Sequence, residues 1–394
     1  MHNDTIEAVG NRCTGCAACS ALCPHHAIEM KANAEGFLVP VIQKERCTDC
    51  GLCYQACPIQ TPPLHHPIEE SNAWAAYNPS EADTLQSSSG GLFSAFANQI
   101  LAEDGVVFGT VLTEDKRAIM VQANDSDGIA PMRGSKYVQG KIDADVYHSI
   151  RQIAKTGKKV LFVGCACQVA GLFSFLGKPY DNVYTIDIVC HGVPSPLLFD
   201  VYCRAIESKQ NAPITQYRFR NKQKGWGIRI SYEVNHQKKY RNGYLDPYMH
   251  HFLLGNTYRE SCYQCPYAQS ARISDMTIGD YWGILQEHPD FYHGNGISLL
   301  LIHTPKGRAL LEKTPLHTLA STFAQMSRHN VNLLRPTTRP QVRGTIYHGI
   351  QTLSPSVFVR QRLKIHYCSK AVIKSCIPSW VKKGIQRIRR RGKR

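Results

Sequence analysis

The chain has 394 residues and a formal net charge of +16, and 43% of its residues are hydrophobic against 19% charged. This composition indicates a globular protein of about two or three domains and excludes an intrinsically disordered chain. No run of about 18 apolar residues and no signal-peptide pattern is found, which predicts a cytoplasmic protein. In that reducing compartment the 16 cysteines are expected to bind metals or redox cofactors rather than to form disulfides.

Two cysteine motifs of identical spacing stand near the start of the chain. "CTGCAACSALCP" and "CTDCGLCYQACP" both read C-x2-C-x2-C-x3-C-P. This is the spacing of bacterial ferredoxins with two [4Fe-4S] clusters, in which the last cysteine of each motif ligates the other cluster. Two zinc knuckles are the alternative, but zinc usually takes two C-x-x-C pairs, and these motifs exceed that. The predicted ligands are Cys13, Cys16, Cys19 and Cys57 for one cluster, and Cys47, Cys50, Cys53 and Cys23 for the other.

A small α+β ferredoxin-type domain is therefore predicted over residues 1–62. Residues 27–42, between the motifs, alternate as in a short hairpin. The Pro-rich stretch after Pro58 marks a domain boundary.

A serine- and glycine-rich loop leads into a helix predicted near residues 92–101. Exposed backbone N–H groups at a helix N-terminus can bind phosphate, and Ser89, Gly90 and Gly91 are the candidates. Serines that merely cap the helix explain this stretch equally well. A hairpin is predicted over residues 106–123.

Two β-turn-α units follow in the middle of the chain. Residues 160–163 and 184–189 are predicted to be strands, each followed by a turn and a helix, which indicates a parallel sheet with crossovers. Ligands of such sheets bind at the carboxyl ends of the strands. Cys165, Cys167 and Cys190 fall at those ends.

A further C-x-x-C pair, Cys262 and Cys265, lies in the second half of the chain. With Cys167 and Cys190 it would supply four thiolates, enough for a [4Fe-4S] cluster or a structural zinc. Spacing alone leaves iron–sulfur, zinc and no metal open. Cys165 competes with Cys167 for its place in the set.

Several ordered segments between about residues 8 and 310 resemble the beta subunits of coenzyme F420-reducing hydrogenase and formate dehydrogenase, a family that includes the plant 7-hydroxymethyl chlorophyll a reductase. The segments are "SSSGGLFSA", "GSKYVQ", "VLFVGCACQVAGL", "DIVCHGVPSP", "FRNKQKGWG", "SCYQCPYA" and "SDMTIGDYWG". The resemblance implies an iron–sulfur flavoprotein that binds FAD, with FAD at the "SSSGG" loop and a third cluster rather than zinc. The family's usual Thr-Pro-Cys-Gln turn is replaced here by Cys165-Ala166-Cys167-Gln168, so Cys167 is the matching ligand.

The resemblance implies an α/β FAD- and Fe-S-binding domain over residues 63–330, with an N-terminal part at about 70–150 and a C-terminal part at about 155–315. Arg218, Arg220 and Lys222 are candidates to hold FAD phosphates or an anionic substrate, although a charged strand face explains them equally. Asp275, Asp280 and Trp282 are expected to form the floor of the cofactor site, with a plain core position as the alternative for Trp282.

Lys136, Tyr137 and His191 are the candidates beside the flavin ring or the substrate, and for His191 a packing role is the favoured alternative. The predicted function is reduction or oxidation of a small organic substrate by electrons passed between the clusters and FAD. Bacterial members with a fused ferredoxin module resemble products of cell-surface polysaccharide gene clusters. The alternative is an electron-transfer subunit that serves a partner enzyme, and an electron-donor protein would be a partner in either case.

Residues 331–394 are predicted to be a basic C-terminal tail. No acidic residue follows Glu312, and residues 360–394 contain 13 Lys and Arg. Apolar residues and Trp380 are interleaved with this charge on either side of Pro378, as in amphipathic helices that bind an anionic membrane surface. This pattern predicts peripheral attachment at the inner face of the membrane, with a packed last helix and a disordered end as the alternative. Nucleic acid is disfavoured, because no aromatic stacking platform accompanies the charge.

Overall fold

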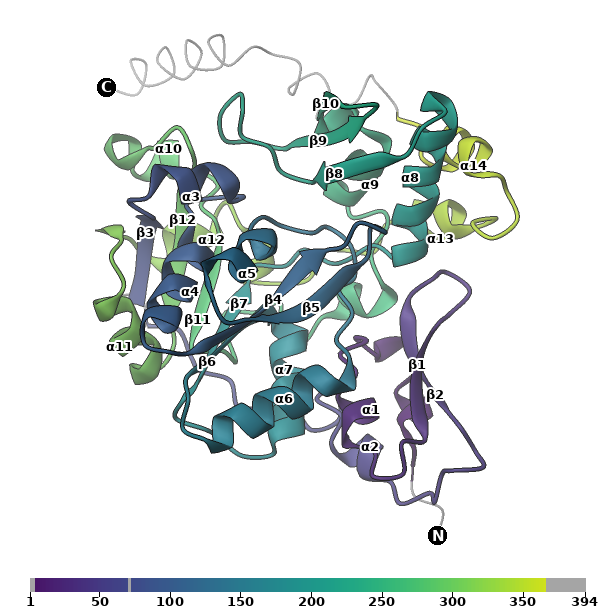
Figure 1. The fold of residues 1–394 in the computed structure, drawn as a ribbon, viewed down its shortest axis with the longest axis horizontal. Helices are drawn as coiled ribbons and strands as arrows, with labels where there is room; N and C mark the ends of the chain where they lie inside the picture. The colour runs from purple at the N-terminus through teal and green to yellow at the C-terminus, as the bar shows by residue number, and fades with distance from the viewer. Residues whose placement is uncertain (1–3, 70–71, 366–394) are drawn as a thin grey trace.

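The computed structural model describes residues 4–69 and 72–365. At its centre lies an eight-stranded mixed sheet, with a three-stranded sheet above it and a small hairpin domain at lower right in the view of Figure 1. The strands of the large sheet are β3 (Ala73–Tyr77), β4 (Val106–Leu112), β5 (Ala118–Ala123), β6 (Val160–Cys165), β7 (Val183–Ile188), β11 (Met276–Asp280), β12 (Ser298–Ile302) and β13 (His317–Ala320). The fold class predicted from the sequence, a small α+β domain followed by an α/β domain, is confirmed.

The small N-terminal domain contains the hairpin that the alternating sequence predicts. Its two strands pair antiparallel, with Ile28 opposite Ile42. Its core is small and includes two of its own cysteines, Cys19 and Cys57. The elements are η1 (Ile6–Arg12), α1 (Ala18–Leu22), β1 (Ile28–Ala32), β2 (Leu38–Ile42) and α2 (Leu52–Gln55).

The large sheet has the order β13-β3-β12-β11-β7-β6-β4-β5. Neighbouring strands are parallel from β4 through β6 and β7 to β11, and antiparallel towards both edges. The N-terminal and C-terminal parts expected from the resemblance therefore share one sheet, because β4 pairs directly with β6.

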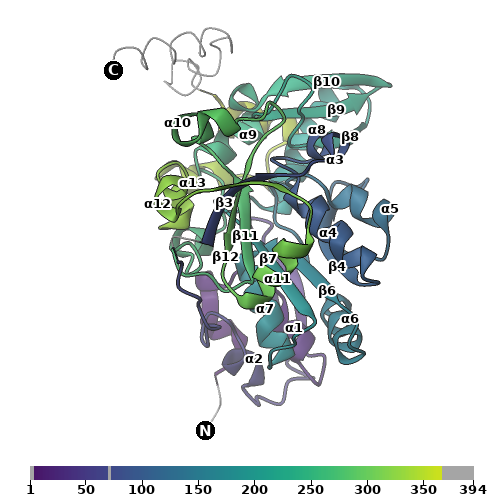
Figure 2. The same cartoon turned by 90° about the vertical axis from the view of Figure 1, so that its left-hand side faces the viewer.

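Helices cover both faces of this sheet, as the nearly continuous burial of its central strands requires. On β6, Val160 and Phe162 pack against α6 (Ala144–Lys155) and α7 (Ala166–Leu176). Leu161 and Val163 point to the opposite face, which is covered by α4 (Leu92–Ala102) and α11 (Pro305–Lys313). Figure 2 shows α4 with α5 (Ser126–Ile129) along one side of the molecule. Near β3 and β12 lie α3 (Glu81–Gln86), α10 (Ile284–Glu287) and α12 (Phe323–Ser327).

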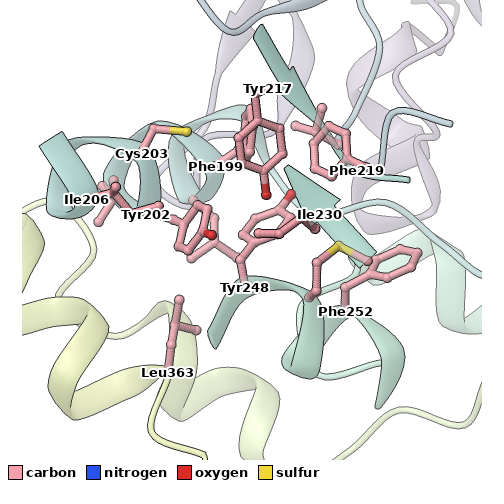
Figure 3. Close-up of a cluster of buried hydrophobic side chains, with 14 of the residues drawn as sticks. Phe199, Tyr202, Cys203, Ile206, Tyr217, Phe219, Ile230, Tyr248, Phe252 and Leu363 are labelled. Atoms are coloured by element: carbon pink, nitrogen blue, oxygen red, sulfur yellow. The ribbon is translucent and has the colours of Figure 1, made fainter. Parts of the chain in front are cut away.

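A second, strongly aromatic core joins the three-stranded sheet to its helices. Phe199 and Tyr202 of one helix point towards Tyr217, Phe219 and the other rings in Figure 3, with Leu363 on the far side. The elements around this core are α8 (Pro196–Gln210), β8 (Ile214–Arg218), β9 (Arg229–Val234), β10 (Gln237–Asn242), α9 (Pro247–Leu253), α13 (Val342–Tyr347) and α14 (Pro355–Arg362).

Residues 331–365, assigned from the sequence to the basic tail, are folded onto the rest of the molecule. Arg343 of α13 is 1% exposed and forms a bidentate ion pair with Glu35 of the β1–β2 turn, at 2.6 and 2.8 Å. Phe358 and Leu363 are buried in the aromatic core. The predicted amphipathic segments around Trp380 lie outside the described residues. Within the described ranges, no helix combines the length and apolar character needed to cross a bilayer.

Candidate functional site

The outer cysteine site of the N-terminal domain consists of the four residues predicted for one cluster. Cys23, Cys47, Cys50 and Cys53 all line a single cavity of about 20 Å³. Cys23 directly follows α1, whereas Cys47 and Cys50 lie on the loop that enters α2 and Cys53 lies in α2 itself. The crossed contribution of Cys23 to the other motif's loop is therefore present in the fold. Cys50 is exposed, so this site lies at the protein surface.

The inner site consists of Cys13, Cys16, Cys19 and Cys57. Burial raises the pKa of Cys16 to about 12, and repulsion by Cys13 and Cys57 contributes to the shift. Burial also raises the pKa of Cys19, with contributions from the other three thiols. These four thiols are thus mutual neighbours. Thiolates crowded in this way are stabilised by positive charge among them, which a metal cluster supplies.

The loop that carries Cys16 lies directly against the sheet domain. A Cβ atom placed on Gly171 of α7 would lie 2.8 Å from Cys16 Cβ and 3.1 Å from its Sγ, so only glycine permits this approach. The Tyr147 hydroxyl of α6 donates to the Cys16 carbonyl at 2.7 Å. Gly171 and Cys167 are four residues apart on α7 and so share one helix face, roughly one turn apart. The inner site is therefore adjacent to Cys167.

The cysteines of the sheet domain form a third site, around a cavity of about 50 Å³ that is called the third cavity below. It is lined by Cys165, Cys167, Cys190, Cys262 and Cys265. Every pair among the four predicted ligands interacts electrostatically. Burial raises the pKa of Cys262 to about 12 and that of Cys265 to about 11. The structure therefore brings together the four residues that the sequence proposes, with Cys165 as a fifth thiol.

Cys165 differs from the other four in its partners. It is the last residue of β6 and the N-cap of α7, and its backbone N–H donates to Gln168 Oε1 at 2.9 Å. Its thiol donates a hydrogen bond to Cys190, which lowers the pKa of Cys190 and raises that of Cys165. Cys167 lies in the first turn of α7, and Cys262 lies in η5 (Glu260–Gln264).

A buried cation adjoins the third cavity. Arg272 is 4% exposed, lines the cavity and donates to Asp187 Oδ1 at 2.7 Å and to the Tyr267 carbonyl at 2.8 Å. Its positive charge counteracts the rise in pKa of Cys265. Hydrogen bonds and charges of this kind around ligand sulfurs adjust the potential of an iron–sulfur cluster.

Among the residues that the structure describes, no group of three or more His, Cys, Asp or Glu side chains converges as a single metal ion requires. A four-iron cluster makes a different demand, because each of its four thiolates binds a different iron. The fit of the three cysteine sites to clusters therefore rests on their donors, since each site brings together at least four cysteines.

A larger cleft of about 250 Å³ lies next to the third cavity. It opens at the carboxyl ends of β6, β7 and β11, where open α/β sheets bind their ligands. Its size is close to the lower end of the range for ligand sites, roughly 300–1,000 Å³. Much of its lining is apolar, from Leu92, Phe93, Met132, Val138, Val163, Ile188, Val189, Phe252 and Ile278.

The "SSSGG" loop forms one wall of this cleft and is firmly anchored. The Ser89 hydroxyl donates to the Ile297 carbonyl at 2.7 Å, and the Gly90 N–H donates to Ser298 Oγ at 2.9 Å. A Cβ on Gly90 would lie 2.6 Å from the Ala76 carbonyl, so the position requires glycine. Gly91, at φ +81°, is the N-cap of α4 without a side-chain cap. The first turn of α4 therefore lines the cleft at Leu92 and Phe93, and its first backbone N–H groups have no side-chain cap.

Arg220 binds residues that form the floor of the cleft, so its guanidinium is not available to bind a ligand there. Its guanidinium pairs with both oxygens of Asp280 at 2.8 and 3.0 Å and donates to the Tyr137 hydroxyl and the Ser88 carbonyl, each at 2.9 Å. Its Nε donates to the Gly227 carbonyl at 2.9 Å. These contacts use all five of its N–H groups. The structure thus assigns Arg220 to positioning the loop and Tyr137.

The two lysines among the candidates, the half-buried Lys136 and the buried Lys222, also have backbone partners. Lys136 donates to three successive carbonyls, those of residues 131–133, and burial lowers its pKa to about 7. Lys222 donates to the carbonyls of Thr84 and Ser89, and burial and then Arg220 lower its pKa to about 7. Lys136 lines the cleft, whereas Lys222 stands behind the loop.

Of the other candidates, Tyr137, His191, Asp280 and Trp282 line the cleft. Trp282 stacks on Trp226 at 5.1 Å, and Trp226 donates to Asp280 Oδ1 at 2.8 Å. Two candidates do not reach the cleft. Asp275 accepts from Thr185 inside the sheet, and Arg218 bonds to Gln86.

The sequence reasoning missed several residues of the site. Thr14 and Gly15, between the first two cysteines, line the cleft although they belong to the N-terminal domain. Gln139 lines it too, and Trp226 supports its floor. Gln139 and Trp226 both lie in segments that carry the family resemblance, and this resemblance could have identified them as site residues. No local sequence pattern predicts that Thr14 and Gly15 line the cleft, because their position there depends on how the two domains dock.

Two family models match separate parts of the chain. Residues 12–61 match the family model described as "4Fe-4S dicluster domain", and residues 157–320 match the model for the C terminus of the family "Coenzyme F420 hydrogenase/dehydrogenase, beta subunit". The chain joins these two domains. The resemblance predicted from the sequence is thereby confirmed, and the chain is an iron–sulfur electron-transfer protein of the oxidoreductase type.

One solved structure with a similar chain is that of the F420-reducing [NiFe] hydrogenase complex from Methanosarcina barkeri. The two chains share 15% sequence identity with a TM-score of 0.42, over 66% of this chain and 84% of that chain. No curated protein matches the chain.

Proposed function

We propose that this chain is an iron–sulfur flavoprotein that transfers electrons between three [4Fe-4S] clusters and FAD, and thereby reduces or oxidises a small organic substrate. The observation that carries the proposal is the position of the loop from Cys13 to Cys16. That loop packs against α7 beside Cys167, and its Thr14 and Gly15 form part of the wall of the cleft. A ferredoxin-type donor is thus built into the wall of the cofactor site.

The order of the sites supports a route from the surface to the cleft. The outer site has an exposed cysteine, the inner site touches α7, and Cys165, Cys167 and Cys190 line both the third cavity and the cleft. When bound, the clusters carry single electrons and FAD exchanges electron pairs with a substrate. An electron-donor protein would bind at the outer site, where Cys50 and Leu52 are exposed.

The residues of the cleft fit a flavin dinucleotide. The first turn of α4 and the "SSSGG" loop would hold the pyrophosphate, and the apolar lining would exclude water from the ring. The Tyr137 hydroxyl accepts from Arg220, which leaves its own proton free to be donated into the cleft. Tyr137 is therefore the proposed proton donor to the substrate, and Lys136 supports the segment that carries it.

The test is anaerobic purification followed by metal and flavin analysis. We expect about twelve irons and one FAD per chain, from three Cys₄ clusters. The reduced protein is then offered candidate oxidants without a partner, and sugar derivatives of cell-surface polysaccharides are the first to try. Reoxidation by a small molecule supports the enzyme. Reoxidation only by an added protein would favour the electron-transfer subunit, and absence of FAD would overturn the proposal.

Membrane attachment through residues 366–394 is a separate proposal, supported by the sequence alone. The test is co-sedimentation with anionic or neutral vesicles at low and high salt. Binding should require anionic lipid, weaken as salt screens the charges, and disappear when the chain ends before Trp380. A full-length protein that ignores anionic vesicles at low salt would contradict it.

A further inference from the structure

Arg259 differs from the other deeply buried arginines in having no carboxylate partner. Four arginines of the described ranges are at most 6% exposed, namely Arg220, Arg259, Arg272 and Arg343. Three of them form ion pairs, with Asp280, Asp187 and Glu35 respectively. Arg259 is 5% exposed, and within residues 4–69 and 72–365 its guanidinium forms no ion pair. A buried charge normally requires a counter-charge, so the missing partner of Arg259 calls for an anion.

The Arg259 guanidinium lies against the loop of the inner site. Its Nε donates to the Cys13 carbonyl at 2.7 Å, and its Nη1 donates to the Leu38 carbonyl at 2.8 Å. The ring of Phe37 lies 5.6 Å from the guanidinium carbon. All three partners are neutral groups, so they do not balance the charge.

The backbone of Arg259 is bonded to the third site. Its carbonyl accepts from the backbone N–H of Cys262, and its own N–H donates to the Val193 carbonyl, each at 2.9 Å. Val193 lines the third cavity, and its backbone donates to the Cys262 thiol. The positive charge of Arg259 counteracts the rise in pKa of Cys262. Arg259 therefore contacts one predicted ligand residue of the inner site and one of the third site.

These two sites supply the kind of anion that the guanidinium lacks. Four thiolates give a [4Fe-4S] cluster a net negative charge, and reduction by one electron adds to it. We propose that Arg259 is a shared counter-charge of the inner and third clusters and raises the reduction potential of both. The inference rests on the proposed function, because it requires a cluster at the third cavity.

The expected effect follows from Coulomb's law. A fixed positive charge stabilises the more negative, reduced state of a nearby cluster, and its burial limits screening by water and salt. Because one charge acts on two sites, both potentials rise and the difference between them changes little. None of the contacts of Arg259 described above involves the outer site. The outer cluster is therefore an internal reference.

The experiment compares Arg259→Gln and Arg259→Lys with the wild type. Arg259→Gln keeps an N–H donor without the charge, whereas Arg259→Lys keeps the charge without the planar fork. Iron per chain is measured first, and the cluster potentials are then measured by redox titration followed by electron paramagnetic resonance. The same titration of Cys167→Ser identifies the signal of the third cluster.

In Arg259→Gln, the reduction equilibria of the inner and third clusters should shift about tenfold towards the oxidised state, which is about 59 mV for one electron. Arg259→Lys should keep most of the wild-type potential, and the outer cluster should be unchanged in both variants. Arg339→Gln is the matched control, because it removes the same charge from an exposed arginine paired with Glu260 of η5. Solvent screens that charge, so all three potentials should stay at their wild-type values.

Unchanged potentials in an Arg259→Gln protein with all its iron would overturn this inference alone. Equal shifts in Arg259→Gln and Arg259→Lys would overturn it too, since the hydrogen bonds and not the charge would then set the potentials. Loss of iron confined to Arg259→Gln would support it, whereas loss in both variants would contradict it. A wild-type protein with only about eight irons would overturn the proposed third cluster together with the shared counter-charge.

Discussion

The N-terminal domain and the sheet domain surround their cysteines in different ways. In the N-terminal domain, Cys19 and Cys57 belong to the hydrophobic core itself, together with Ile6, Val9 and Ile28. In the sheet domain, helices pack on both faces of eight strands, and the cysteines of the third cavity stand at the edge of that core. A domain of about 60 residues has little apolar surface to bury, so bound metal must supply much of its stability. The sheet domain has enough core to fold without bound metal.

Docking compensates in part for the small core of the N-terminal domain. Arg259, 5% exposed, donates to the Cys13 carbonyl at 2.7 Å and to the Leu38 carbonyl at 2.8 Å. Arg343 holds Glu35 at the tip of the hairpin. Hydrogen bonds and an ion pair from the sheet domain thus fix the loop of the inner site and the hairpin, while the outer site remains at the surface.

The largest expected effect is that of removing the iron. Anaerobic chelation should unfold residues 1–62, because their core loses the clusters that tie its cysteines together, while the sheet domain stays folded. Limited proteolysis followed by mass spectrometry would show cuts confined to the N-terminal domain. An iron-free protein that resists protease throughout would contradict the proposed difference in metal dependence between the two domains. It would mean that docking alone keeps the N-terminal domain folded.

The second prediction concerns the ion pair beneath the cleft. Asp280→Asn should destabilise the sheet domain by about 3–5 kcal/mol, because it leaves Arg220, whose side chain is 1% exposed, buried without a counter-charge. Asp200→Asn breaks an exposed pair with Arg204 and should cost only about 0.3–0.5 kcal/mol. Denaturant unfolding of the iron-free proteins measures both. Equal effects would show that the buried pair is not what holds the floor of the cleft.

The third prediction concerns the loss of stability of the sheet domain at acid pH, which we attribute to a histidine and not to the cysteines. Burial lowers the pKa of His303 to about 4, below the usual value of 6.5. The unfolded chain therefore binds the proton first as pH falls, and stability decreases from pH 6.5 towards pH 4. The loss by pH 5 should be about 2 kcal/mol. His303→Gln should remove that part of the slope in iron-free protein, and an unchanged slope would count against it.

The smallest expected effect on folding comes from the third cavity. Cys167→Ser should lose about four irons while both ferredoxin-type signals persist in electron paramagnetic resonance, with the sheet domain still resistant to protease. Cys165→Ser is the matched variant and should keep all the iron, because the family resemblance assigns the ligand to Cys167 and Cys165 donates a hydrogen bond to Cys190. The reverse pattern would show that the altered turn has moved the ligand to Cys165.

Local sequence was enough to predict the ferredoxin-type hairpin, the two β-turn-α units and the sets of cysteines. Each of these depends on short-range spacing, which is visible in the chain: alternation over residues 27–42, or a strand followed by a turn at Cys165 and Cys190. The candidate phosphate loop was also predicted in this way, since glycines before a helix are a local signal.

The roles of Arg220, Gln139 and residues 331–365 depended on the tertiary structure. A charged residue near a strand end looks the same in sequence whether its five donors face a ligand or, as in Arg220, face Asp280 and the backbone. The partners of Arg343 and Gln139 lie more than 100 residues away, at Glu35 and Leu38. Pattern and spacing report only on neighbours along the chain, whereas such partners are chosen by how the two domains dock. The sequence therefore determined which side chains are candidates to bind iron or a cofactor, and docking determined which of them face the cleft.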